Sequence, residues 1–226
     1  FPETFSMQES EDKIIYLQNY LQTYLEKDVR AIESISNLNL YKNMMDHAAE
    51  TTGSIRNDQR IIESLGCTRD TLKKYRGLLE ATLLYQDVYP YINSTLKRLV
   101  KNPKTYLLSN GLISVLTGLT DLNVLQRSGL IGHRLENWFL DELKTYCVRN
   151  PMQPDINFWR TMTGVEVDFI LIKKPTVYPF EVTFSIKKES KKIKNLMNFM
   201  QDEKKAPWAY YIYQGEFEID ADRRII

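Results

Sequence analysis

The C-terminal part of the sequence alternates between helical and strand-like patterns in one particular order. A helical pattern, HRLENWFLDELKTYCVR, is followed by three strand-like stretches, INFWRT, VEVDFILI and FEVTFS. A second helical pattern, KKESKKIKNLMNFMQDE, then precedes a last strand-like stretch, APWAYYIYQGE. A leading helix, strands, a helix and a final strand predict a mixed α/β domain, which we place over residues 120–226.

Residues 1–119 are predominantly helical and contain a helix-turn-helix pattern. Apolar residues recur at helical spacing over Ser10–Ile35 and Leu38–Thr52. Two further helical stretches follow, NDQRIIESLG and RDTLKKYRGLLEATLL, with a turn at Gly66 and a cap at Thr68. Two strand-like stretches around a polar loop come next, so residues 57–110 predict a winged helix. The fold class expected for the whole chain is therefore α+β or mixed.

Bulk composition does not select a partner. Lys plus Arg is 30 and Asp plus Glu is 29, so net charge does not indicate nucleic acid or a membrane. No apolar run approaches the roughly 20 residues that span a bilayer, and no membrane partner is predicted. Two cysteines, Cys67 and Cys147, are too few for a disulfide framework, which favours a reducing cytoplasm.

Two carboxylates interrupt the apolar strand patterns. Side chains two apart share a face of a strand, so Asp168 and Glu181 converge if their strands are neighbours. Two close carboxylates repel each other, and a Mg²⁺ ion would relieve that repulsion and could activate a water. Glu136, on the preceding helix, is a third candidate acid. The alternative is that these acids lie separately on solvated faces.

The order of these motifs resembles the PD-(D/E)xK nuclease-like fold. The motifs are GHRLE with Glu136, FWR with Arg160, G-x-E-x-D with Gly164, Glu166 and Asp168, and PFEV with Glu181. With YLQTYLEKDVR, the winged-helix pattern and PKTYLLSNGL, the chain is similar to the C-terminal region of a prokaryotic AAA-type P-loop ATPase family. The resemblance implies an ATPase module that binds ATP and that either lies upstream or has been lost. This chain itself has no G-x-x-x-x-G-K-[ST] motif.

One position departs from the nuclease pattern. The resemblance implies a lysine two residues after Glu181, beside the attacked phosphate, but Thr183 occupies that position. A short neutral hydroxyl cannot supply the charge of an ammonium group. Five lysines follow closely, at positions 187, 188, 191, 192 and 194. They fit the solvated face of an amphipathic helix, although one of them could reach back to the acids.

Basic residues also gather on the predicted winged helix. On its second helix these are Arg69, Lys73, Lys74 and Arg76, and on the predicted wing they are Lys97, Arg98, Lys101 and Lys104. The first set would enter a DNA major groove and the second would follow phosphates. The alternative is a protein-interaction or spacer domain.

Three functions fit these features. The first is a nucleic-acid-binding module of an AAA-type ATPase whose nuclease-like domain is weakly active or inactive because of Thr183. The second is an active Mg²⁺-dependent DNA nuclease that uses Asp168 and Glu181 for the metal, assisted by Glu136. The third is a platform that couples the ATPase to a protein partner. The sequence leaves the oligomeric state open.

Overall fold

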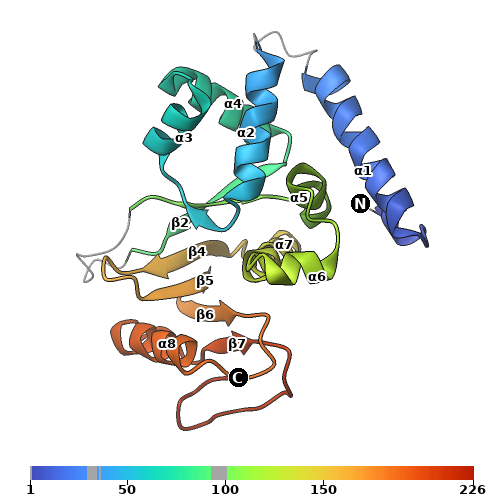
Figure 1. Cartoon of the computed structure of the whole chain (residues 1–226). Helices are drawn as coiled ribbons and strands as arrows, with labels where there is room; N and C mark the ends of the chain where they lie inside the picture. The colour runs from blue at the N-terminus through green and yellow to red at the C-terminus, as the bar shows by residue number, and fades with distance from the viewer. Residues whose placement is uncertain (1, 30–34, 36, 93–100) are drawn as a thin grey trace. The chain divides into compact units, whose positions relative to one another are not determined.

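A computed structural model describes residues 2–29, 35, 37–92 and 101–226 (Figure 1). The chain divides into two compact units. The first comprises Phe1–Gln86 and Thr105–Leu130, and the second comprises Asp87–Lys104 and Ile131–Ile226. Helices and strands occur together, which confirms the mixed α/β class. No helix in the described ranges is long and apolar enough to cross a membrane.

The first unit is mainly helical. Its helices are η1 (Pro2–Phe5), α1 (Ser10–Thr23), η2 (Tyr24–Val29), α2 (Leu38–Glu50), α3 (Asp58–Leu65), α4 (Arg69–Ala81), α5 (Asn110–Thr117) and α6 (Leu122–Arg127). The helix predicted over Ser10–Ile35 is shorter, because α1 ends at Thr23 and a π-helical segment follows. Positions 30–34 of that prediction lie outside the described residues.

Local side-chain chemistry explains the pair of helices α3 and α4. The Asn57 side chain accepts a hydrogen bond from the amide of Arg60, which caps the start of α3. Gly66 ends α3 in the left-handed conformation, at φ 61°, where a residue without Cβ has no steric penalty. Thr68 then caps α4 by accepting from the amide of Thr71. The helix, turn and helix predicted from this sequence are therefore present.

Short strands accompany these helices. They are β1 (Ser54–Ile55), β2 (Tyr85–Pro90) and β3 (Lys104–Leu107), hydrogen-bonded in the order β1-β3-β2. Both β2 and β3 run from one unit into the other along the chain. The predicted turn near residue 93, with Lys97 and Arg98, lies outside the described residues.

The second unit contains the predicted order of elements. They are α7 (Ile131–Arg149), β4 (Asp155–Arg160), β5 (Glu166–Lys173), β6 (Thr176–Val182), α8 (Ser190–Asp202) and β7 (Tyr210–Ile212). Strand order is β2-β4-β5-β6-β7. The pairs β4/β5 and β5/β6 are antiparallel, whereas β2/β4 and β6/β7 are parallel. The two parallel pairs place non-consecutive segments of the chain side by side.

Helices α7 and α8 pack on the strands through aromatic residues. Phe139 of α7 lies 5.8 Å from Phe169 of β5 and 5.4 Å from Phe180 of β6, measured between ring centroids. Phe199 of α8 lies 5.5 Å from the Trp159 ring of β4 in an edge-to-face arrangement. Because helices cover these strands, the middle of β5 is buried at consecutive positions, which explains its nearly continuous apolar sequence.

Candidate functional site

Asp168 and Glu181 are brought together by the pairing of β5 with β6. The antiparallel register places Phe169 opposite Phe180, so the next step of the register places Asp168 opposite Glu181. The amide of Val182 donates a 2.9 Å hydrogen bond to Asp168 Oδ2. Asp168 is only 5% exposed and Glu181 only 1%. These acids form a buried pair and do not lie on solvated strand faces.

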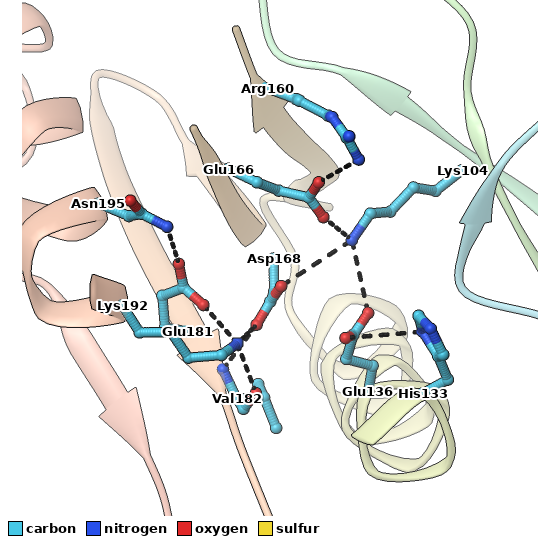
Figure 2. Close-up of polar contacts among 10 residues, drawn as sticks. All are labelled: Lys104, His133, Glu136, Arg160, Glu166, Asp168, Glu181, Val182, Lys192 and Asn195. Atoms are coloured by element: carbon cyan, nitrogen blue, oxygen red, sulfur yellow. Dashed lines mark hydrogen bonds and ion pairs between the residues drawn. The ribbon is translucent and has the colours of Figure 1, made fainter. Parts of the chain in front are cut away.

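Lys192 of α8 reaches both of these carboxylates (Figure 2). Its Nζ lies 2.9 Å from Asp168 Oδ2, 2.7 Å from Glu181 Oε2 and 3.0 Å from the Val182 carbonyl oxygen. Asn195, one turn further along α8, donates to Glu181 Oε1 at 3.4 Å. The sequence left open which lysine, if any, reaches back to the acids, and the structure places Lys192 there.

Thr183 lies directly after β6 and points its hydroxyl group at the start of α8. Thr183 Oγ1 donates to Glu189 Oε1 at 2.5 Å, and its amide donates to the Ile212 carbonyl oxygen at 2.9 Å. Glu189 is the residue immediately before α8. Thr183, which stands at the expected lysine position, therefore anchors the start of the helix that carries Lys192.

Lys104 forms the other half of the charged cluster. Its Nζ contacts Glu166 and lies 3.4 Å from Glu136 Oε2 and 3.9 Å from Asp168 Oδ1. The expectation that Lys104 follows phosphates on an exposed wing is wrong. This residue is 2% exposed, and its ammonium group is held by the buried acids of the second unit. Nothing in the local sequence around Lys104 indicated partners so distant along the chain.

Glu136 and Glu166 border the pair of acids. Glu136 of α7 is buried and lies with its Oε1 3.9 Å from His133 Nδ1, while Arg160 Nη1 donates to Glu166 Oε2 at 2.7 Å. Glu136 was among the predicted acids, whereas Glu166 and Arg160 were recognised only as parts of the motif order. Their mutual ion pair holds Glu166 toward Lys104 (Figure 2).

Burial and charge set the protonation of this cluster. Burial alone would raise the pKa of Asp168, but the ammonium groups of Lys104 and Lys192 lower it below its ordinary value. Burial raises the pKa of Glu181, and the negative charge of Asp168 raises it further. Burial also raises the pKa of Glu136. Asp168 is consequently the ionised partner of Lys192, and Glu181 and Glu136 take up protons more readily than ordinary glutamates.

The residues fit a divalent cation with few protein ligands. Among the residues that the structure describes, no group of three His, Cys, Asp or Glu side chains could hold a metal ion. Mg²⁺, however, needs only one or two carboxylates and keeps several waters. Asp168, Glu181 and the Val182 carbonyl direct three oxygens at a single point, which Lys192 Nζ occupies. Asp168 and Glu181 could hold Mg²⁺ there if Lys192 moved away.

The residues predicted to contact DNA differ in exposure. Arg69, Lys73 and Lys74 are exposed on α4, and Lys101, which belongs to the second unit, is also exposed. Arg76 Nη1 instead lies 3.1 Å from Asp58 Oδ1, and this ion pair links α4 to α3. Lys97 and Arg98 lie outside the described residues. The exposed basic side chains of α4 are thus Arg69, Lys73 and Lys74.

The chain is similar to families and relatives that are themselves described as of unknown function or uncharacterized. Residues 131–226 match a family model described as "Domain of unknown function (DUF4143)". Uncharacterized proteins of Mycobacterium bovis and Mycobacterium tuberculosis are each 24% identical to the chain over 181 residues, covering 80% of this chain. The chain spans only 40% of the length of these relatives. No solved structure matches the chain significantly. Residues 1–123, more than half of the chain, match the model described as "Domain of unknown function (DUF8612)", and the chain therefore belongs to that family.

Proposed function

We propose that the second unit is a nuclease-like domain of the PD-(D/E)xK type that hydrolyses DNA with Mg²⁺, and that Lys192 takes the role of the lysine missing at Thr183. One observation carries this proposal: Lys192 Nζ contacts both Asp168 and Glu181, at 2.9 and 2.7 Å. The order α7, β4, β5, β6, α8, β7 supports it, because the resembling fold has the same order of elements. The argument that Thr183 makes the site inactive loses force, since an ammonium group is present beside the acids.

Each side chain of the cluster has a distinct task in this proposal. Asp168 and Glu181 would hold Mg²⁺, which when bound supplies positive charge at the phosphate and activates a water. Lys192 would place a second positive charge where a phosphate oxygen gains negative charge. Glu136 would assist by holding a proton near the leaving group, because burial raises its pKa.

Lys104 and Arg160 have positioning tasks. Lys104 contacts Glu136 and Glu166, and Arg160 holds Glu166 from the other side. These ion pairs compensate the negative charge of a buried cluster, which would otherwise be costly to desolvate. These ion pairs do not involve the oxygen atoms of Asp168 and Glu181 that contact Lys192. Those oxygen atoms are therefore the part of the cluster at which Mg²⁺ would bind.

A cleavage assay tests the proposal. The purified chain would be incubated with single-stranded and double-stranded DNA, with Mg²⁺ or Mn²⁺ and with EDTA. Asp168→Asn keeps the shape of the side chain and removes its charge, and Asp202→Asn on the exposed end of α8 is the matched control. We expect metal-dependent cleavage that is lost in Asp168→Asn and kept in Asp202→Asn. Absence of cleavage, or cleavage that survives Asp168→Asn, contradicts the proposal.

We propose that α3 and α4 of the first unit are the helix-turn-helix of a winged helix that binds DNA through α4. Arg69, Lys73 and Lys74 present positive charge on the second helix of a helix-turn-helix arrangement, where such charge would meet phosphates. The two units would then divide the work, with the first holding DNA and the second acting on it. A protein-interaction role is the alternative outcome, and the salt dependence of DNA binding separates the two.

A second candidate function is a nuclease-like scaffold that binds nucleic acid without cutting it. The specific observation in its favour is that Lys104 and Lys192 form ion pairs with the buried acids, so that the cluster contains positive charge without a metal. This scaffold would bind DNA equally well with and without Mg²⁺. The absence of cleavage in the assay above, together with DNA binding that is equal with and without Mg²⁺ in a fluorescence anisotropy titration, would support it.

The longer relatives suggest a setting for these activities. Because the mycobacterial relatives are two and a half times as long as the matched region, we propose that the whole protein is a cytoplasmic AAA-type ATPase. An upstream module would bind ATP, and the described chain would couple its motion to DNA. The full-length protein should bind ATP, whereas the 226-residue chain should not. ATP binding by the isolated chain would contradict this division.

A further inference from the structure

All three donor positions of the Lys192 ammonium group are used within the chain. A protonated lysine has three N–H donors, and the three oxygens around Nζ belong to Asp168, Glu181 and the Val182 carbonyl. These are oxygen ligands of the kind that a divalent cation binds. An ammonium group so placed is not available to a phosphate. Lys192 therefore occupies the place that the cation needs and, in that position, cannot perform the task proposed for it.

We propose that Lys192 is a tethered cation that competes with a divalent cation for Asp168 Oδ2, Glu181 Oε2 and the Val182 carbonyl oxygen. In one state the ammonium fills the position. In the other the divalent cation fills it, and the displaced ammonium becomes available to a phosphate group. The inference rests on the proposed metal site but not on cleavage, since the exchange concerns only the occupant of three oxygens.

The surroundings of Lys192 allow this exchange. Its side chain is 23% exposed, and a lysine carries its charge on a flexible four-carbon stem. Its neighbours Lys191 and Lys194 are exposed, so this region of α8 borders solvent. Release of the ammonium group therefore requires a change of side-chain rotamer but no unfolding of the helix.

The carboxylates keep their orientation when the ammonium leaves. The Val182 amide holds Asp168 Oδ2 at 2.9 Å, and Asn195 Nδ2 holds Glu181 Oε1 at 3.4 Å. Neither contact involves Lys192. Preorganised oxygens lower the entropic cost of capturing a cation. The site vacated by the lysine is thus already shaped for its replacement.

Measured Mn²⁺ affinity tests the competition directly. Titration calorimetry would compare the wild-type chain with Lys192→Met, and Lys191→Met is the matched control on the exposed face of the same helix. We expect Lys192→Met to bind Mn²⁺ about tenfold more tightly or better, because a direct competitor is removed. Lys191→Met should bind like the wild type. Equal affinity of Lys192→Met and wild type overturns the inference, as does absence of Mn²⁺ binding by both.

A general charge effect requires its own control. Lys104→Met also removes an ammonium group from the cluster, but Lys104 contacts Glu136, Glu166 and the other oxygen of Asp168. Direct competition predicts that Mn²⁺ affinity increases much more in Lys192→Met than in Lys104→Met. An equal increase of Mn²⁺ affinity in both variants would show that only the net charge of the cluster matters, and it would overturn direct competition. Thermal melting of each variant without metal verifies that it is folded.

The wild-type chain offers a second readout without mutation. An amine-acylating reagent would modify Lys192 slowly when its three donors are engaged, and peptide mass spectrometry would measure the extent. Saturating Mn²⁺ should accelerate modification of Lys192 severalfold relative to Lys191 in the same peptide region. An unchanged ratio overturns the exchange. If the chain cleaves DNA but neither the Mn²⁺ affinity of Lys192→Met nor the modification of Lys192 changes as expected, only the present inference is rejected. If both readouts change as expected but no DNA is cleaved, only the nuclease proposal is rejected.

Discussion

Thr183 and Glu189 are joined by a 2.5 Å hydrogen bond from the threonine hydroxyl to the glutamate side chain. Glu189 precedes α8, and its amide donates to the Tyr211 hydroxyl at 2.9 Å. Lys192 follows three residues later on the same helix. Thr183, at the position where the resembling nuclease pattern has a lysine, and Lys192 of α8 are therefore physically linked, because Thr183 anchors the start of the helix that carries Lys192.

Removing the Thr183 hydroxyl should weaken the second unit. Thr183→Val keeps the shape and deletes the donor to Glu189, at a cost of about 1 kcal/mol in the free energy of unfolding. Thr183→Ser retains the hydroxyl group and should lose less. Urea unfolding followed by tryptophan fluorescence reports on the second unit, because Trp138, Trp159 and Trp208 all belong to that unit. Equal stability of the valine and serine variants would contradict the anchoring role.

Replacing Lys73 and Lys74 by alanine should weaken DNA binding and flatten its dependence on salt. If both lysines neutralise phosphates, the slope of log affinity against log salt should decrease by about two. Fluorescence anisotropy at several salt concentrations measures this slope. Both side chains are exposed on α4, so the variant should melt like the wild type.

Lys42→Ala provides the control for that measurement, because Lys42 is an exposed lysine on α2 of the same unit. Its slope should be close to that of the wild type. Equal slopes for all three proteins would remove α4 as a DNA-contacting helix and favour a protein-interaction role.

The first unit should lose stability in mild acid because of His47. Burial lowers the pKa of His47 below its ordinary value of 6.5. Between that folded-state pKa and 6.5 the unfolded chain binds more protons, so the free energy of unfolding decreases as pH falls through this window. His47→Gln should show a smaller decrease between neutral pH and about pH 5. Urea unfolding by far-ultraviolet circular dichroism measures it, and identical pH dependence in both proteins would contradict the assignment.

Sequence patterns predicted the parts of the fold that depend on local chemistry. The turn at Gly66 and the cap at Thr68 specify α3 and α4 because each signal acts within a few residues. Asp168 and Glu181 were expected to converge if their strands were neighbours, and β5 and β6 are paired. A short connection joins these two strands, and such strands are usually neighbours. Period-two alternation alone left open whether the two acids lie on a solvated face.

Partners that are distant in sequence could not be predicted in the same way. Lys104 contacts Glu136 and Glu166, which are far from it in the sequence. The residues next to Lys104 in the sequence resemble an exposed basic loop. Lys192 was one of five similar lysines, and only the placement of α8 against β5 and β6 distinguishes it. The exposure and the ion pairs of charged residues depend on tertiary packing. The periodicity of a single segment gives no information about that packing.

The proposal that Lys192 takes the role of a lysine at position 183 is tested most directly by exchanging the two residues. Single-turnover DNA cleavage would be measured for the wild type, Lys192→Met, and Thr183→Lys combined with Lys192→Met. We predict that Lys192→Met slows cleavage about 100-fold or more, since a charge at the phosphate is lost, and that the added Thr183→Lys restores part of the rate. Wild-type cleavage by Lys192→Met, or a double variant as slow as Lys192→Met, would contradict this proposal.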